Sequence, residues 1–354
     1  MKHQTLIKTF VVLVLGAAVL SGCMIQFGGS KSAGVAGVFK SFDKGANWTP
    51  KNLFLYSGGT GSIAGMNVLS LTFDPQDNRA IYLASDVNGL LYTYDAAESW
   101  MKADQVGNGK ISSAVIDPKN KCVIYATFAN TILKSIDCNR SWKEIYIDSR
   151  VDKVLTALAV DFYNSLIIYA GNSAGDLLLS TDGGDNWQVI NRLGDRAMKI
   201  MIAPNDNRII YVATKGKGIY KSVDAGKTWN DINADLKDYA GAMEYKNLIF
   251  DLSQQNSIML ISKYGLIKSA DGGATWLPIK LITPPSSVDI YATAINPKNS
   301  NEIYYATATT FYKTVDGGKN WVTTRLPSSA AATYLVIDPI NPNILYMGFS
   351  NLSK

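Results

Sequence analysis

Seven aspartates recur along the chain, and each stands five residues before a tryptophan. Carboxylates are common acids and bases in hydrolases, so these are the first residues to weigh as a catalytic set. Each, however, lies two residues after a Ser or Thr and, in most cases, two residues before a Gly. Because Asp accepts backbone N–H bonds in turns and Gly permits positive φ, we interpret all seven as scaffold residues. The pairs are Asp43 and Trp48, Asp95 and Trp100, Asp137 and Trp142, Asp182 and Trp187, Asp224 and Trp229, Asp271 and Trp276, and Asp316 and Trp321.

Histidine is nearly absent from the sequence. The single one, His3, lies in an N-terminal segment that we expect to be removed, which excludes imidazole-based nucleophilic catalysis and ordinary His-ligated metal sites. We therefore predict no metal and no cofactor. A glycosidase that uses two carboxylates needs no histidine and is therefore not excluded. Its acid and base would come from Asp86, Asp176, Asp195 or Glu244.

The N-terminus has the pattern of an export signal. Two lysines precede the apolar run Phe10 to Leu20, which is too short to span a bilayer. The next residues, Ser21-Gly22-Cys23, resemble the end of the lipobox at which bacterial lipoproteins are cleaved and acylated. The resemblance implies a signal peptide at 1–22, an acylated Cys23, and a flexible tether at 23–34. We expect the protein in the cell envelope, anchored to a membrane and facing the periplasm or exterior.

The spacing of the tryptophans indicates a repeated unit. The seven segments align without gaps, and successive tryptophans lie 42–52 residues apart, the length of one four-stranded propeller blade. Each segment follows a short β-rich run such as Gly218–Ser222 and so forms the corner of a hairpin. Earlier runs, such as Leu69–Pro75 and Ala80–Ala84, supply two further strands per blade. We predict an all-β, seven-bladed propeller over residues 35–354.

Two corners depart from the pattern. Asn139 replaces Gly in the third, and Asn enters the left-handed region readily. Ala97 replaces Gly in the second corner. Alanine, unlike Gly or Asn, does not readily adopt positive φ, so we expect that turn to differ in shape from the others. The intact Asp95 and Trp100 indicate that the blade is kept.

The repeated segment resembles the Asp-box, or bacterial neuraminidase repeat (BNR). This repeat is found in sialidases, sortilin-type receptors, xyloglucanases and propellers like the photosystem II assembly factor. The resemblance extends over nearly all of the mature chain. It implies that each box joins the third and fourth strands of a blade and that any site lies on the opposite face of the ring.

The ends of the chain predict how the ring closes. Before the first box there is only one strand, Gly37–Ser41, and after the seventh box there are two, Tyr334–Pro339 and Asn343–Gly348. The N-terminal strand would therefore complete the C-terminal blade, giving six whole blades and one shared blade. Joining the ends removes the open sheet edges that would favour aggregation.

Function must be sought in the loops opposite the boxes, because the propeller is a scaffold that hosts many activities. The mature net charge of +3 does not indicate nucleic acid. Neither the Arg-Ile-Pro motif of sialidases nor a second propeller of the xyloglucanase type is present. We therefore favour a monomeric, non-catalytic module that binds an envelope or membrane protein, or a polysaccharide, with a xyloglucanase-like or sialidase-like glycosidase as the alternative. The binding-face residues, a basic and aromatic set, are Tyr56, Arg150, Arg192, Arg196, Lys215, Tyr239, Tyr245, Lys263, Tyr264 and Arg325.

Cys122 and Cys138 are the only cysteines left once Cys23 is acylated. Export to an oxidising compartment favours a bridge. If Phe128 faces Thr131 across a hairpin, Cys122 falls opposite the residue before Cys138, so the two sulfurs come within reach. Two buried free thiols are the alternative.

Overall fold

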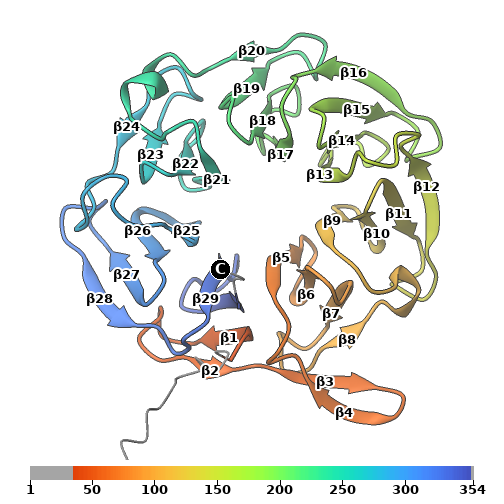
Figure 1. The fold of residues 1–354 in the computed structure, drawn as a ribbon, viewed down its shortest axis with the longest axis horizontal. Coiled ribbons are helices and arrows are strands. Elements are labelled where there is room, and N and C mark those ends of the chain that lie inside the picture. The colour runs from red at the N-terminus through yellow and green to blue at the C-terminus, as the bar shows by residue number, and fades with distance from the viewer. Residues whose placement is uncertain (1–34, 352–354) are drawn as a thin grey trace, which may run out of the picture. The chain divides into compact units, whose positions relative to one another are not determined.

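The computed structural model describes residues 35–351, which form seven four-stranded antiparallel sheets arranged in a ring (Figure 1). Side chains near the ring centre line a central channel. The proposed signal peptide, Cys23 and the tether lie outside the described residues. The innermost, first strands of the blades are β5 (Val68–Asp74), β9 (Ile111–Asp117), β13 (Leu155–Val160), β17 (Ala197–Ile202), β21 (Tyr245–Phe250), β25 (Ala292–Asn296) and β29 (Ala331–Ile337). The second strands are β6 (Asp77–Ser85), β10 (Asn120–Phe128), β14 (Ile168–Asn172), β18 (Ile210–Thr214), β22 (Ile258–Ser262), β26 (Asn299–Ala306) and β30 (Leu345–Ser350).

The two outer strands of each blade flank an Asp box. The third strands are β1 (Gly37–Ser41), β7 (Leu90–Thr93), β11 (Thr131–Ser135), β15 (Asp176–Ser180), β19 (Ile219–Ser222), β23 (Leu266–Ser269) and β27 (Thr310–Thr314). The fourth are β2 (Thr49–Pro50), β8 (Met101–Lys102), β12 (Lys143–Ile147), β16 (Gln188–Arg192), β20 (Asn230–Asp231), β24 (Leu277–Pro278) and β28 (Val322–Arg325). Two short 3₁₀ helices, η1 (Asp104–Val106) and η2 (Asp235–Asp238), lie in connections. The placement of the box between the third and fourth strands is confirmed.

The ring closes as the sequence predicts. One sheet has the order β2-β1-β30-β29, so strands from both ends of the chain share a blade. The register runs from Gly37 opposite Phe349 to Ser41 opposite Leu345. The N-terminal strand thereby covers the edge that β30 would otherwise expose.

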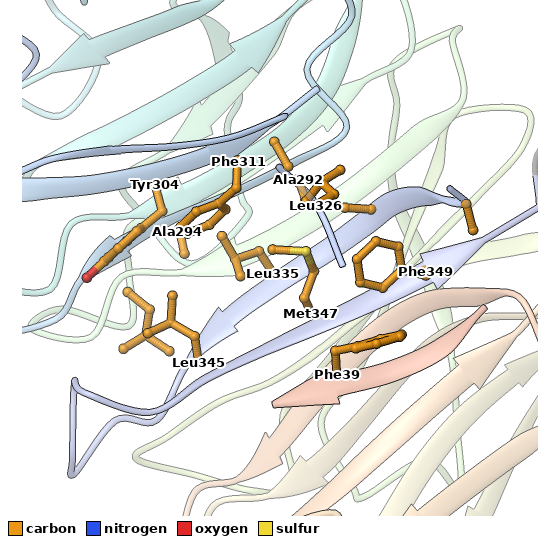
Figure 2. Close-up of a cluster of buried hydrophobic side chains, with 14 residues drawn as sticks. Phe39, Ala292, Ala294, Tyr304, Phe311, Leu326, Leu335, Leu345, Met347 and Phe349 are labelled. Atoms are coloured by element: carbon orange, nitrogen blue, oxygen red, sulfur yellow. The ribbon is translucent and has the colours of Figure 1, made fainter. Parts of the chain in front are cut away.

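Apolar side chains between neighbouring blades form the core. At the closing blade, Phe39 of β1 packs edge-to-face on Phe349 of β30, with ring centroids 5.0 Å apart (Figure 2). Met347 and Leu335 join the same cluster, which reaches Phe311 of the preceding blade. Strand alternation places such residues on the faces that stack against the next blade, so each sheet is stabilised by its neighbours.

Each Asp box is held by one set of hydrogen bonds. In the first, Ser41 Oγ donates to Asp43 Oδ1 at 2.8 Å and accepts from Gly45 N at 2.8 Å. Asn47 donates to the same carboxylate from its backbone N (2.8 Å) and its side-chain amide (2.7 Å). These N–H donors, with that of the Asn47 backbone foremost, lower the pKa of Asp43 to about 2. The set recurs in all seven boxes, which confirms their role as turns.

Positive φ occurs at two successive positions of every box, the fourth and the fifth residues. The fifth is the expected Gly position, and Ala97 (φ 69°) and Asn139 (φ 69°) adopt the same conformation there. The corner at Ala97 is therefore as regular as the others, contrary to expectation, because Thr93 Oγ1 still accepts from Ala97 N at 3.2 Å. The fourth position, Ala96 in that box (φ 61°), is an additional left-handed residue that the sequence pattern does not reveal.

The segment between β2 and β5, which holds Tyr56 and which we expected to be one of the loops opposite the boxes, instead contains a hairpin. It consists of β3 (Leu53–Tyr56) and β4 (Gly59–Ser62) and projects outward from the ring (Figure 1). Leu55 N donates to Trp100 O, and Trp100 N donates to Leu53 O, both at 2.8 Å. The hairpin thus borders the blade that follows it in the chain.

Cys122 and Cys138 form a disulfide, with Cα atoms 4.0 Å apart. The register that brings them together has Phe128 opposite Thr131 and Ile124 opposite Ser135, as expected from the sequence. Cys138 N also donates to Cys122 O at 3.1 Å. The bridge therefore ties the second strand of this blade to its Asp box.

Candidate functional site

The ring has two faces with different chemistry. The box face carries the seven Asp boxes, and the loop face carries the connections between second and third strands and those from a fourth strand to the next blade. Most of the residues that the sequence nominates lie on the loop face. They gather there in two groups, which we call the arginine cluster and the lysine–tyrosine cluster.

The arginine cluster consists of Asp148, Arg150, Asn172, Asp176 and Arg192. The Arg150 Nη2 atom lies 2.8 Å from Asp148 Oδ2 and 2.5 Å from Asp176 Oδ2, so one guanidinium joins two buried carboxylates. Arg192 Nε lies 3.4 Å from Asp176 Oδ1, and the Asn172 amide donates to both carboxylates. The bonds from Arg150 lower the pKa of Asp148.

This geometry brings Arg150, Arg192 and Asp176 together and adds Asp148, which the sequence alone does not indicate. The side chains of Arg150 and Arg192 are 45% and 75% exposed, while both carboxylates are almost fully buried. The carboxylates therefore anchor the two guanidinium groups from below. The exposed N–H groups are left to bind acceptors above the face.

The lysine–tyrosine cluster consists of Tyr239, Lys246, Lys263, Tyr264 and Asp289. The rings of Tyr239 and Tyr264 lie 5.1 Å apart, and the Tyr239 hydroxyl donates to Trp276 O at 3.3 Å. Lys246 and Lys263 each place Nζ 3.4 Å from Asp289 Oδ1. This cluster also includes two residues that the sequence did not predict for this face, Lys246 and Asp289.

Three of the four proposed glycosidase carboxylates have other roles in the structure. Asp176 belongs to the arginine cluster. Asp195 accepts from three backbone N–H groups, those of Arg196, Gly216 and Lys217, and so orders a turn. Asp86 Oδ2 accepts from the Asn67 amide at 2.6 Å, and Glu244 takes part in backbone bonds of the loop before β21.

The other nominated residues are spread around the ring. Arg325 ends β28 on the loop face opposite Thr310, and Lys215 lies in the turn after β18. Tyr56 is at the end of β3, on the projecting hairpin. Tyr245 starts β21 and lines the central channel rather than the surface. No helix within residues 35–351 is long and apolar enough to cross a membrane.

Comparisons with known proteins agree with this fold. The family described as "Sortilin, neurotensin receptor 3" matches residues 175–265. A xyloglucanase from Paenibacillus sp is 25% identical over 275 residues, which cover 69% of this chain and 24% of that protein. This chain therefore spans about a quarter of that relative.

Solved structures extend the likeness to about four fifths of this chain. The Niastella koreensis GH74 enzyme has a TM-score of 0.64 at 18% identity and covers 81% of this chain, which matches 52% of the enzyme. The structure of YCF48 bound to D1 peptide has a TM-score of 0.59 at 17% identity, with 80% of this chain and 94% of that chain covered. At these identities the likeness shows the fold alone. The chain is a seven-bladed β-propeller, and its residues 175–265 are similar to the sortilin family.

Proposed function

We propose that this protein is a non-catalytic binding module, held on a membrane through Cys23, whose loop face receives a segment of an envelope or membrane protein. The observation that carries the proposal is the arginine cluster, in which buried Asp148 and Asp176 hold two exposed guanidinium groups. A general acid for glycoside cleavage must be protonated. Arg150 instead lowers the pKa of Asp148 and so favours its ionised form.

The size of the chain favours the same interpretation. It covers nearly all of YCF48, a single propeller solved with a D1 peptide, but only about half of the GH74 enzyme. Arg and Tyr are enriched among the residues that contribute most to the free energy of binding. Arginines are present in the arginine cluster, and tyrosines are present in the lysine–tyrosine cluster. We therefore propose an assembly or adaptor role.

The test is capture of partners from detergent-solubilised envelope by the full-length protein, read by mass spectrometry. Arg192→Ala removes an exposed cation from the loop face and Lys263→Ala removes a half-buried one, so we expect the captured partner to be reduced at least fivefold. Arg208→Ala is the matched control, because Arg208 is equally exposed but pairs with Asp206 in a turn on the box face. Equal capture by all three variants would contradict the proposal.

A glycosidase of the xyloglucanase type is the second candidate. It is favoured by the likeness to the Paenibacillus enzyme and by two carboxylates that share one Arg150 nitrogen. Incubation of the protein with a panel of glycans that includes xyloglucan separates the two functions. Hydrolysis that is lost in Asp176→Asn would establish the enzyme and overturn the binding module.

A further inference from the structure

The first strands of the blades enclose a channel of about 510 Å³ that runs through the ring. Its lining changes along its length. Near the loop face it is polar, with Lys199 of β17, Tyr245 and Lys246 of β21, and Tyr334 of β29. Towards the box face it becomes apolar and continues into a crevice of about 300 Å³, and the side chains shared by the two spaces include Phe73, Val115, Leu158 and Ile200.

Lys199 is a cation without a carboxylate partner in this channel. Its Nζ donates to Asn247 Oδ1 at 3.0 Å, and the side chains that line the channel within residues 35–351 include no Asp or Glu. Lys199 keeps part of its surface open to the channel but lies deep inside the ring, where desolvation lowers its pKa to about 8. The ammonium group has three N–H donors, and Asn247 takes one of them.

Lys246 is a useful contrast on the neighbouring strand. It also lines the channel, but its Nζ lies 3.4 Å from Asp289 Oδ1 at the loop face. Lys246 therefore has a carboxylate beside it, which it shares with Lys263, whereas Lys199 has none. A buried charge without a counter-charge is costly, so an anion that enters the channel gains most beside Lys199.

Two phenols add neutral donors to the polar end. Burial raises the pKa of both Tyr245 and Tyr334, and the nearby Tyr334 adds to the effect on Tyr245. Both hydroxyls therefore keep their protons at neutral pH. One ammonium group with neutral hydroxyls around it matches a single negative charge, since a dianion would leave one charge uncompensated in a poorly solvated space.

We propose that the channel binds a monocarboxylic acid with an apolar chain. The carboxylate accepts hydrogen bonds from Lys199 Nζ at the polar end, and the chain extends along Phe73, Val115, Leu158 and Ile200 towards the box face. This site lies inside the ring and is separate from the arginine cluster. The proposed channel site therefore does not depend on the arginine cluster, which carries the proposed function.

The probe is octanoate, titrated by calorimetry into the full-length protein in detergent micelles, with the same micelles alone as the blank. We expect one octanoate per chain. Burial of each methylene strengthens binding about fourfold, so acetate should bind at least tenfold more weakly than octanoate. 1-Octanol has the tail without the charge and should also bind at least tenfold more weakly.

Lys199→Met keeps the length of the side chain and removes the charge, so we expect octanoate affinity to fall at least tenfold. Lys298→Met is the matched control and should change affinity less than threefold, because Lys298 is exposed outside the channel, where its Nζ donates to Ile340 O. Thermal unfolding of each variant checks the fold, and Lys199→Gln replaces Lys199→Met if the latter does not fold.

Four results would overturn the proposal. The first is that the unaltered protein does not bind octanoate, and the second is that Lys199→Met binds octanoate with equal affinity. The third is that octanol binds as tightly as octanoate, which would mean an apolar crevice only. The fourth is that acetate binds as tightly as octanoate, which would mean a small-anion site only. The comparison of octanoate with octanol and acetate needs no variant. It therefore decides the question even if both Lys199 variants unfold.

Discussion

Replacement of Phe39 by alanine tests whether the N-terminal strand holds the ring closed. Phe39 is 5% exposed and packs on the fully buried ring of Phe349. Truncation of a buried phenylalanine costs about 3–5 kcal/mol, within which the edge-to-face geometry accounts for about 0.5–1.5 kcal/mol. The backbone pairs between β1 and β30 remain, so we expect the loss of unfolding free energy to lie in that range.

The measurement is equilibrium unfolding in urea, where the midpoint should fall with little change in slope. Phe42→Ala is the control in the same segment. Phe42 is 54% exposed, and Lys40 Nζ lies 4.8 Å from its ring centroid, so its removal should cost less than about 1 kcal/mol. An equal loss in both variants, or a loss below about 1 kcal/mol for Phe39→Ala, would refute the view that β1 stabilises the closed ring.

Four further predictions concern the boxes, the disulfide and the anchor. Replacing both Cys122 and Cys138 by serine should lower the free energy of unfolding by about 3 kcal/mol, measured in urea, and mass spectrometry of the unreduced protein should find the two peptides linked. Gly184→Ala should cost about 1–3 kcal/mol, because φ is 101° and the new Cβ would lie 2.5 Å from Ile145 Cδ1; an unchanged melting temperature would argue against it. Hydrogen bonds within the boxes lower the pKa to about 2 for five aspartates, against about 3.9 in the unfolded chain: Asp43, Asp182, Asp224, Asp271 and Asp316. These carboxylates therefore stabilise the folded state fully above about pH 4, and this stabilisation is lost as the pH falls through 2. A melting temperature that stays constant from pH 5 to pH 2 would contradict this. Cys23→Ala should abolish acylation and release the protein from membranes, and acyl label that persists on the variant would disprove the lipobox interpretation.

The blades were predictable because the information is local and repeated. The Ser or Thr and the Asp of each box are two residues apart, and the hydrogen bonds of these two side chains close within the same turn. The ring closure followed from the unmatched strands at the two ends. The register around Phe128 and Thr131 followed from the short hairpin between them.

The β3–β4 hairpin was missed because its stability depends on a distant residue. Leu53 and Leu55 bond to the backbone of Trp100, in the next blade, while the glycines of β4 resemble a loop in the sequence. The second left-handed position of each box was missed for another reason. Lys44 and Ala96 are not residue types that indicate positive φ.

The site could be predicted only in part. The sequence predicted three residues of the arginine cluster separately: Arg150, Arg192 and Asp176. Nothing in their spacing shows that one guanidinium joins two carboxylates. Lys199 was missed because a lysine near the start of a strand is usually exposed, and only closure of the ring places it in a channel. The alternation of Lys199 with apolar neighbours in an innermost strand is the signal that would have indicated it.

The shared blade has a consequence for the order in which the protein can fold. β1 pairs with β30, and Gly37 lies 312 residues from its partner Phe349. Loop-closure entropy grows slowly, so this contact costs only about 2 kcal/mol more than closing a loop the length of one blade. The pairing instead slows folding, because β1 is synthesised first and its partner strand β30 last. Until β30 has been synthesised, β1 has an unpaired edge and Phe39 has no ring to pack against, so the nascent chain exposes a strand edge of the kind that favours aggregation.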